Sequence, residues 1–255
     1  MIDKLYNILF QRHTNDIAFW KRNWSSKIEL YEKKGLTDWD VFSSKRYYQI
    51  LFNDISDYIG SDFNGKNVLE FGAGTGMLSL FMAAHGANVY LLDVLPEALK
   101  YASILEKTGR IELKSFKGTV TYLNSDFAKF SNNKSFESFF DIVHNSGVVE
   151  EYDINGAVGI VDMMRKLTKD DGSIVIGVPN FLNPYLIKIW MKYGKGNELY
   201  FNKSRLRKVI RSCGFDKIKI STTSYVYPFK KYTCLESFLG KNGLGFLHVA
   251  IVKKM

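Results

Sequence analysis

The chain has 255 residues, of which 46% are hydrophobic and 15% aromatic, and this is enough material for one large α/β core. Two cysteines are too few for a disulfide framework, and four prolines without a low-complexity tract argue against long disordered linkers. No apolar run is long enough to cross a membrane, and the first residues lack the apolar stretch of a secretory signal. The sequence therefore predicts a cytoplasmic protein.

The formal net charge of +9 comes from several short basic runs. We interpret them as a solvated, lysine-rich surface, which disfavours a nucleic-acid partner and leaves it as an alternative. Histidine and cysteine do not cluster at zinc-ligand spacing, so we expect no metal site. The runs are Lys33-Lys34, Lys45-Arg46, Lys203 to Lys208 and Lys253-Lys254.

Residues 1–60 are predicted to form an N-terminal helical extension. Trp20 and Trp24 belong to an aromatic stripe with helical spacing, and a second stripe begins after Asp38. Two interpretations stay open. The stripes pack as ordinary core, or the helices form a lid whose Trp20 and Trp24 line an acceptor pocket.

Residues 61–255 alternate strand-like and helix-like segments, which predicts a mainly parallel sheet covered on both faces. The most informative segment follows the apolar pair Val68-Leu69. It runs Glu70, Phe71, then the glycine-rich turn Gly72, Ala73, Gly74, Thr75 and Gly76, and leads into a predicted helix over Met77 to His85. Glycines in such a turn let a ligand approach the backbone, and the helix presents its free N–H groups.

The spacing of this turn selects among nucleotide-like ligands. A dinucleotide fingerprint is G-x-G-x-x-G, whereas here the third glycine comes one residue earlier. Glu70 would repel a pyrophosphate but would suit a cationic ammonium or sulfonium group. S-adenosylmethionine carries both cations, and the pattern resembles motif I of the class I S-adenosylmethionine-dependent methyltransferases.

Later strand ends extend the resemblance. It implies that Asp93, with Val94, binds the ribose, and that Ser125, Asp126 and Phe127 bind the adenine. From the residues alone, Asp93 can instead cap the helix near Pro96, and Asp126 can be a turn residue. The resemblance also implies that a cofactor-facing loop follows the fourth strand, formed by Asn145, Ser146, Gly147 and Val148.

The fold that the resemblance implies is a Rossmann-like, seven-stranded, mainly parallel sheet with helices on both faces. Its last strand, Phe246 to Lys253, would be antiparallel. The Asn183-Pro184 start and the aromatic content of residues 181–200 predict a cap insertion before the sixth strand. Together with Trp20 and Trp24, the expected substrate pocket contains Tyr152, Asn180 and Tyr185.

The catalytic candidates lie after the fourth strand. The chain is similar to the small-molecule branch of quinone-biosynthesis methyltransferases, in which Glu-His often ends this stretch; here it is Glu150-Glu151. Glu151 is a base, a partner for a cationic acceptor, or simply the start of a helix. His144 is a second candidate base, with a structural role as its alternative.

The resemblance therefore implies an S-adenosylmethionine-dependent methyltransferase that yields S-adenosylhomocysteine (SAH). We expect a small-molecule acceptor and a monomer or homodimer. Asn145-Ser146-Gly147-Val148 lacks the proline pair of base-amine methyltransferases, although other RNA or protein acceptors stay open. Alternatives of another class are an NAD-dependent oxidoreductase and a non-catalytic cofactor-binding subunit.

Overall fold

The computed structural model describes residues 17–113, 116–193, 200–226 and 234–254. In this part of the chain, seven strands form one sheet in the order β3-β2-β1-β4-β5-β7-β6. β7 pairs antiparallel with β5 and β6, and the other pairings are parallel. The predicted fold class is thereby confirmed. The strands are β1 (Asn67–Phe71), β2 (Asn88–Asp93), β3 (Thr119–Asn124), β4 (Phe140–Ser146), β5 (Thr168–Pro179), β6 (Lys219–Thr222) and β7 (Leu247–Lys253).

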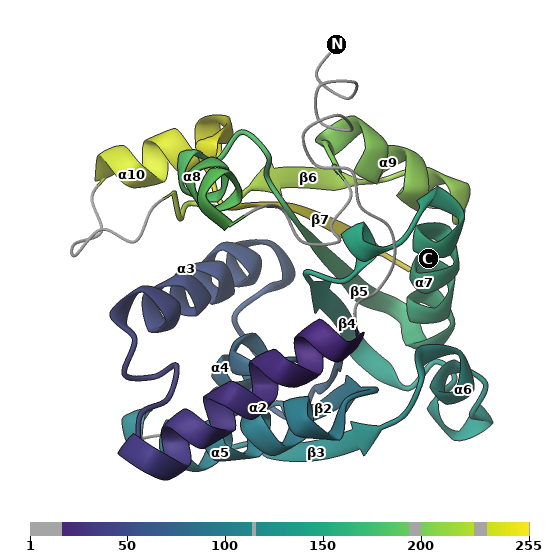
Figure 1. Ribbon diagram of the computed structural model, residues 1–255. Coiled ribbons are helices and arrows are strands. Elements are labelled where there is room, and N and C mark those ends of the chain that lie inside the picture. The colour runs from purple at the N-terminus through teal and green to yellow at the C-terminus, as the bar shows by residue number, and fades with distance from the viewer. Residues whose placement is uncertain (1–16, 114–115, 194–199, 227–233, 255) are drawn as a thin grey trace.

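Helices cover both faces of the sheet (Figure 1). One face carries α4 (Met77–Ala84) and α5 (Pro96–Glu112), and the other carries α6 (Phe127–Ser131), α7 (Ile154–Leu167) and α9 (Lys203–Ser212). Val68 belongs to the first core and its neighbour Leu69 to the second, and both are fully buried. Because successive residues of a strand point to opposite faces, a sheet buried on both sides needs such continuous apolar runs.

The N-terminal helices α2 (Ile17–Lys34) and α3 (Phe42–Ile59) share the core of the α4 and α5 face. Trp24, Leu51 and Ile55 are buried in the same cluster as the strand residues of that face. The Trp39 indole, in the connection between the two helices, donates to the backbone oxygen of Leu105 at 2.8 Å. The aromatic stripes therefore do serve as core, and they also bring α2 to the edge of the sheet where the strands end.

The remaining described elements are two helices and three helical turns. They are α8 (Pro184–Tyr193), α10 (Cys234–Leu239) and the helical turns η1 (Lys134–Phe136), η2 (Val149–Glu151) and η3 (Gly240–Leu244). The predicted cap insertion at residues 181–200 contains α8, while residues 194–199 lie outside the described part. Among the described helices, none has the length and apolar character required to cross a bilayer.

Candidate active site

The sequence-predicted residues converge where the parallel strands end. β1 lies between β2 and β4. The strands that follow β1 in sequence are added first on one side of it, as β2 and β3, and then on the other side, beginning with β4. Ligands on open α/β sheets bind at such a switch point, beyond the carboxyl ends of the strands. Glu70 lies in β1, Asp93 ends β2, Ser125 follows β3, and Asn145 lies near the end of β4.

The glycine turn has the positive-φ backbone that its sequence predicts. Gly72, Gly74 and Gly76 have φ values of 66°, 52° and 64°, a region that disfavours side chains. A Cβ on Gly72 would lie 2.6 Å from Val148 Cγ2, so the loop after β4 packs directly against this turn. A Cβ on Gly74 would lie 3.2 Å from the Trp24 ring. The turn is therefore closely approached by residues from two distant segments.

Glu70 is a buried carboxyl whose Oε2 has no hydrogen-bond partner among the residues that the structure describes. Burial raises its pKa to about 8, although the hydroxyl and amide of Ser79 oppose this effect. A buried, unpartnered polar atom costs free energy, and a cationic group placed there would remove that cost. The residue therefore fits the ammonium group of S-adenosylmethionine.

Asp93 has a more fixed environment than Glu70. Its Oδ2 accepts from the backbone N–H of Gly74 at 3.1 Å, and its Oδ1 accepts from that of Leu95 at 2.9 Å. Burial raises the pKa of Asp93, while these amide bonds lower it. Leu95, rather than Asp93, is the N-cap of α5. Asp93 thus orients the glycine turn while its remaining lone pairs stay suited to ribose hydroxyls.

The segment after β3 shows a structural role for one adenine candidate. Asp126 is exposed and is the N-cap of α6, its Oδ1 accepting from the backbone N–H groups of Ala128 and Lys129 at 2.8 and 3.2 Å. The Phe127 ring packs against Phe71 at a centroid distance of 4.8 Å. It also lies 3.6 Å from the position of a Gly72 Cβ, so it forms one wall beside the glycine turn. Ser125 is half-buried and Val94 is exposed.

His144 lies inside the sheet domain. It is fully buried, and its Nε2 lies 2.8 Å from the Ser79 hydroxyl and 4.0 Å from Glu70 Oε2. Burial lowers its pKa to about 3, so the imidazole is neutral. This environment matches the structural alternative, in which His144 supports Ser79 and Glu70 from behind.

The loop after β4 forms the side of the site opposite β2. Asn145 is buried, Gly147 has a φ of 86°, and Val148 is buried against Gly72. In η2, Glu151 Oε1 accepts from the Trp20 indole Nε1 of α2 at 3.0 Å. Tyr152, the next residue, is half-buried.

An aromatic cluster that sequence reasoning missed lies beside this loop. We define it as Tyr47, Tyr185, Tyr225 and Phe246. Of these four residues, only Tyr185 was among the predicted residues of the substrate pocket. The Tyr47 ring lies 5.4 Å from that of Tyr225 and 5.0 Å from that of Phe246, and Tyr185 lies 6.4 Å from Phe246. Burial raises the pKa of the Tyr47 phenol and the neighbouring Tyr48 raises it further, a hydrogen bond with Ser146 lowers it, and Glu150 adds a smaller increase. The cluster is therefore adjacent to the predicted cofactor-facing loop.

The side-chain amide of Asn180, another predicted pocket residue, is hydrogen-bonded to backbone groups. Its Nδ2 donates to the backbone oxygens of Gly243 and Gly245 at 2.8 and 2.7 Å, and its Oδ1 accepts from Leu182 at 3.1 Å. These bonds fix η3 and the connection that leads to Phe246.

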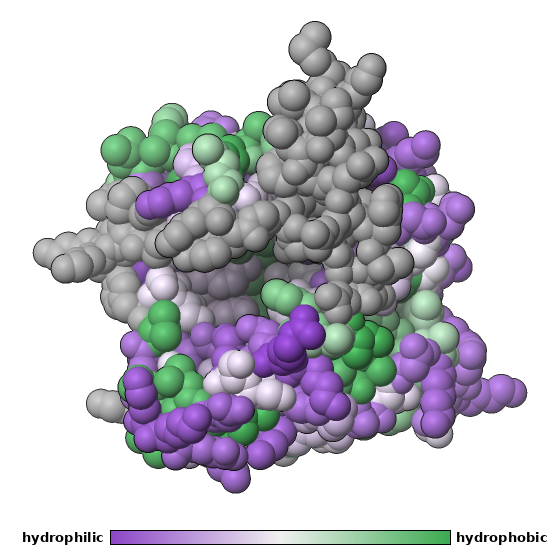
Figure 2. All heavy atoms as spheres, in the orientation of Figure 1, coloured by the Kyte–Doolittle hydropathy of each residue, from purple (hydrophilic) through white to green (hydrophobic). Residues whose placement is uncertain are grey.

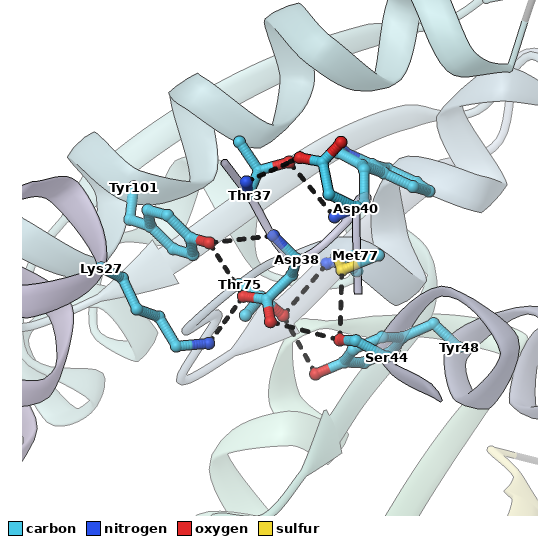
Figure 3. Close-up of polar contacts among 10 residues, drawn as sticks. Lys27, Thr37, Asp38, Asp40, Ser44, Tyr48, Thr75, Met77 and Tyr101 are labelled. Carbon is cyan, nitrogen blue, oxygen red and sulfur yellow. Dashed lines mark hydrogen bonds and ion pairs between the residues drawn. The ribbon is translucent and has the colours of Figure 1, made fainter. Parts of the chain in front are cut away.

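A polar network attaches the N-terminal helices to the cofactor side of the site (Figure 3). Asp38 contacts Lys27 Nζ at 2.6 Å, the Tyr101 hydroxyl at 2.9 Å and the Ser44 hydroxyl at 3.3 Å. Beside it, the Thr75 hydroxyl of the glycine turn bonds to the Tyr48 hydroxyl at 3.0 Å. Tyr47 and Tyr48 belong to the second aromatic stripe predicted after Asp38, whose helical spacing carried no signal for these distant partners.

Comparisons with known proteins agree with this geometry. A family model described as a methyltransferase domain matches residues 43–220. The chain is 28% identical over 171 residues to a ubiquinone biosynthesis O-methyltransferase of Actinobacillus pleuropneumoniae serotype 7, covering 64% of this chain and 69% of that protein. It is 29% identical over 157 residues to the enzyme so named from Glaesserella parasuis serovar 5, covering 60% and 64%.

Solved structures share the fold at low sequence identity. Magnesium protoporphyrin IX methyltransferase from Synechocystis PCC 6803, solved with bound SAH, is similar with a TM-score of 0.55 and 15% identity, covering 100% of this chain and 94% of that one. An O-methyltransferase family protein from Burkholderia thailandensis gives a TM-score of 0.58 at 14% identity, covering 84% and 59%.

Proposed function

The chain belongs to the methyltransferase-domain family and is an S-adenosylmethionine-dependent methyltransferase, and from this premise we propose that its methyl acceptor is a small molecule. This assignment excludes the nicotinamide-dependent oxidoreductase considered from the sequence. It also sets aside the non-catalytic subunit, since the chain is an enzyme.

The observation that carries the cofactor part of the proposal is the unpartnered, buried Oε2 of Glu70 at the end of β1. Glu70 would hold the ammonium group, and the glycine turn would surround the methionine portion. Asp93 would accept from the ribose hydroxyls, and Ser125 to Phe127 would border the adenine. Asn145 to Val148 would form the wall beside the sulfonium. Tyr48, through its bond to Thr75, would position the turn.

When bound, S-adenosylmethionine supplies a methyl group on a sulfonium that is already activated for in-line displacement. The contribution of the chain is therefore alignment of the acceptor and exclusion of water. The aromatic cluster would provide an apolar surface for the acceptor, with the Tyr47 hydroxyl directed to Ser146. An oxygen or nitrogen acceptor must also lose a proton. We propose Glu150 as the group that takes it, because its carboxyl is buried and its Oε1 lies 3.7 Å from the position of a Gly147 Cβ, in the loop beside the sulfonium.

Two observations support a small acceptor over an RNA or a protein. α2 and α3 cover the strand ends, and aromatic side chains gather beside the predicted methyl-transfer position. Small-molecule sites are concave and lined mainly by apolar and aromatic groups, with a few polar side chains for orientation. The two relatives named as ubiquinone biosynthesis O-methyltransferases agree with this class of acceptor.

A methyl-transfer assay tests the proposal. The purified chain and S-adenosylmethionine are incubated with separate panels of phenols, amines, total RNA and protein, and SAH release is measured. We expect turnover with a member of the small-molecule panels. Turnover confined to RNA or protein would overturn the proposed acceptor class while leaving the family assignment intact.

A further inference from the structure

Helix α2 bridges the two walls of the cofactor site. On one wall it pairs with α5, through Lys21 with Glu97 at 3.2 Å and Glu32 with Lys100 at 3.3 Å. On the other wall, Trp20 of α2 donates its indole N–H to Glu151 Oε1 at 3.0 Å. Since α5 follows β2 and Glu151 follows β4, these attachments lie on opposite sides of the switch point.

The inward face of α2 lies directly on the glycine turn. The Trp24 ring is 3.2 Å from the position of a Gly74 Cβ, and it stacks with Tyr101 of α5 at 6.1 Å. The Trp20 ring stacks on Trp24 at 5.9 Å with an interplanar angle of 17°. The two indoles therefore form a continuous cover from α5 to η2.

The outward face of the same helix is mainly polar, although Ile17, Phe19 and Leu30 are also exposed there. Figure 2 shows hydrophilic residues gathered over the region of α2 and α5. Figure 1 shows α2 running across the front of the sheet toward the end of β4. Trp24 and Ile28 of α2 belong to the apolar core, whereas Trp20 is only partly buried. The Trp20 end of the helix can therefore lift from the site while the rest stays packed, provided that the bond to Glu151 releases.

The two attachments differ in kind. Both ion pairs with α5 involve side chains that are largely exposed, Lys21 and Lys100 being 60% exposed. Such pairs contribute little individually, but the stacked Trp24 and Tyr101 rings reinforce that side. The bond between Trp20 and Glu151 joins side chains that are 131 residues apart, and it links α2 to the wall beside the predicted methyl-transfer position.

From this geometry we propose that Glu151 is a positioning residue: by accepting the Trp20 indole N–H, it holds α2 closed over the bound cofactor, and loss of this bond opens the site for SAH release. The inference rests on the proposed function, because it concerns the same site. It replaces the sequence-based idea of Glu151 as a base with a role as a hydrogen-bond acceptor. An acceptor role requires an oxygen at this position but no titrating carboxylate.

Three variants separate the positioning role from a base. Glu151→Gln keeps a side-chain oxygen that can accept the indole N–H, Glu151→Ala removes it, and Trp20→Phe keeps an aromatic ring without the donor. Glu32→Gln is the matched control, because it breaks an exposed ion pair that joins α2 to α5 and leaves the bond between α2 and η2 intact. The readouts are the SAH dissociation rate, followed by intrinsic tryptophan fluorescence, and amide hydrogen exchange across Ile17–Lys34 in the SAH complex. Neither readout requires a known acceptor.

We expect SAH to dissociate about tenfold faster from Glu151→Ala and Trp20→Phe, equivalent to about 1.4 kcal/mol, with faster exchange in α2. Glu151→Gln and Glu32→Gln should stay within about threefold of the unmodified chain. Unchanged SAH release and exchange in Glu151→Ala would overturn the inference. So would Glu151→Gln behaving like Glu151→Ala. Failure of the unmodified chain to bind SAH at all would instead refute the proposed function.

Discussion

Replacing Glu70 with glutamine should stabilise the folded chain and lower its affinity for the cofactor. The Glu70 carboxyl is buried, and within the described part of the chain its Oε2 has no hydrogen-bond partner. Burial raises the pKa of this carboxyl from 4.5 to about 8. Because the folded-state pKa lies above the unfolded-state value, the unfolded chain releases this proton at lower pH. The contribution of Glu70 to the free energy of unfolding is therefore fully present below pH 4.5 and is lost progressively as the pH rises toward 8.

The size of the effect follows from the same shift. Each pH unit above 4.5 lowers the free energy of unfolding by about 1.4 kcal/mol until the carboxyl of the folded chain ionises. At pH 7 the free energy of unfolding is therefore lower by about 3 kcal/mol than at pH 4.5. Glutamine does not titrate and avoids this loss. Glu70→Gln should therefore be more stable than the unmodified chain by about 3 kcal/mol at pH 7, with little difference at pH 4.5.

Urea denaturation at both pH values measures this difference, with Glu29→Gln, an exposed site on α2, as the control. Calorimetric titration with SAH should show roughly hundredfold weaker binding to Glu70→Gln, because a charged partner of the ammonium group is lost. Equal stability of Glu70→Gln and the unmodified chain at pH 7 would refute the reasoning about the unpartnered carboxyl. Undiminished SAH affinity would refute its assignment to the ammonium group.

Three further predictions follow from the site. Binding of SAH at pH 7 should release close to one proton from Glu70, because the ammonium group favours the ionised carboxylate. Calorimetric titrations in buffers of different ionisation enthalpy measure the number of protons released, and a value of zero would contradict this prediction. Gly72→Ala should destabilise the chain by about 1–3 kcal/mol, since its φ is 66° and its Cβ would meet Val148 at 2.6 Å; a denaturation midpoint equal to that of the unmodified chain would argue against the strain. Tyr48→Phe should raise the KM for S-adenosylmethionine, whereas Tyr47→Phe should affect the acceptor KM or kcat. Steady-state kinetics separate the two, and identical effects on both substrates would contradict this division of the site.

The residues that the sequence located well are those at the ends of parallel strands. Glu70, Asp93 and Asn145 were predictable because consecutive strand–helix units must bring their carboxyl ends to one edge of the sheet. The glycine turn was also predictable from the sequence, because few residues other than glycine fit its positive φ values and close packing. Local spacing and the topology of the fold were sufficient for this half of the site.

The acceptor side depends on contacts that local patterns do not encode. The spacing of Trp20 placed it on a helix but could not reveal Glu151 as its partner. The cluster around Tyr47 draws Tyr225 and Phe246 from the far end of the chain, through the packing of α3 against the β7 end of the sheet. Asp126 illustrates the opposite case, because its residue type suited both a helix cap and an adenine contact, and only the structure revealed the cap.

A crystal structure of the chain with SAH would show directly whether Glu70 and Asp93 hold the cofactor product. The amino nitrogen of SAH should lie within about 3 Å of Glu70 Oε2, and the two ribose hydroxyls should contact the Asp93 carboxylate. An SAH molecule whose amino group lies away from Glu70, with its ribose contacting neither oxygen of Asp93, would contradict it.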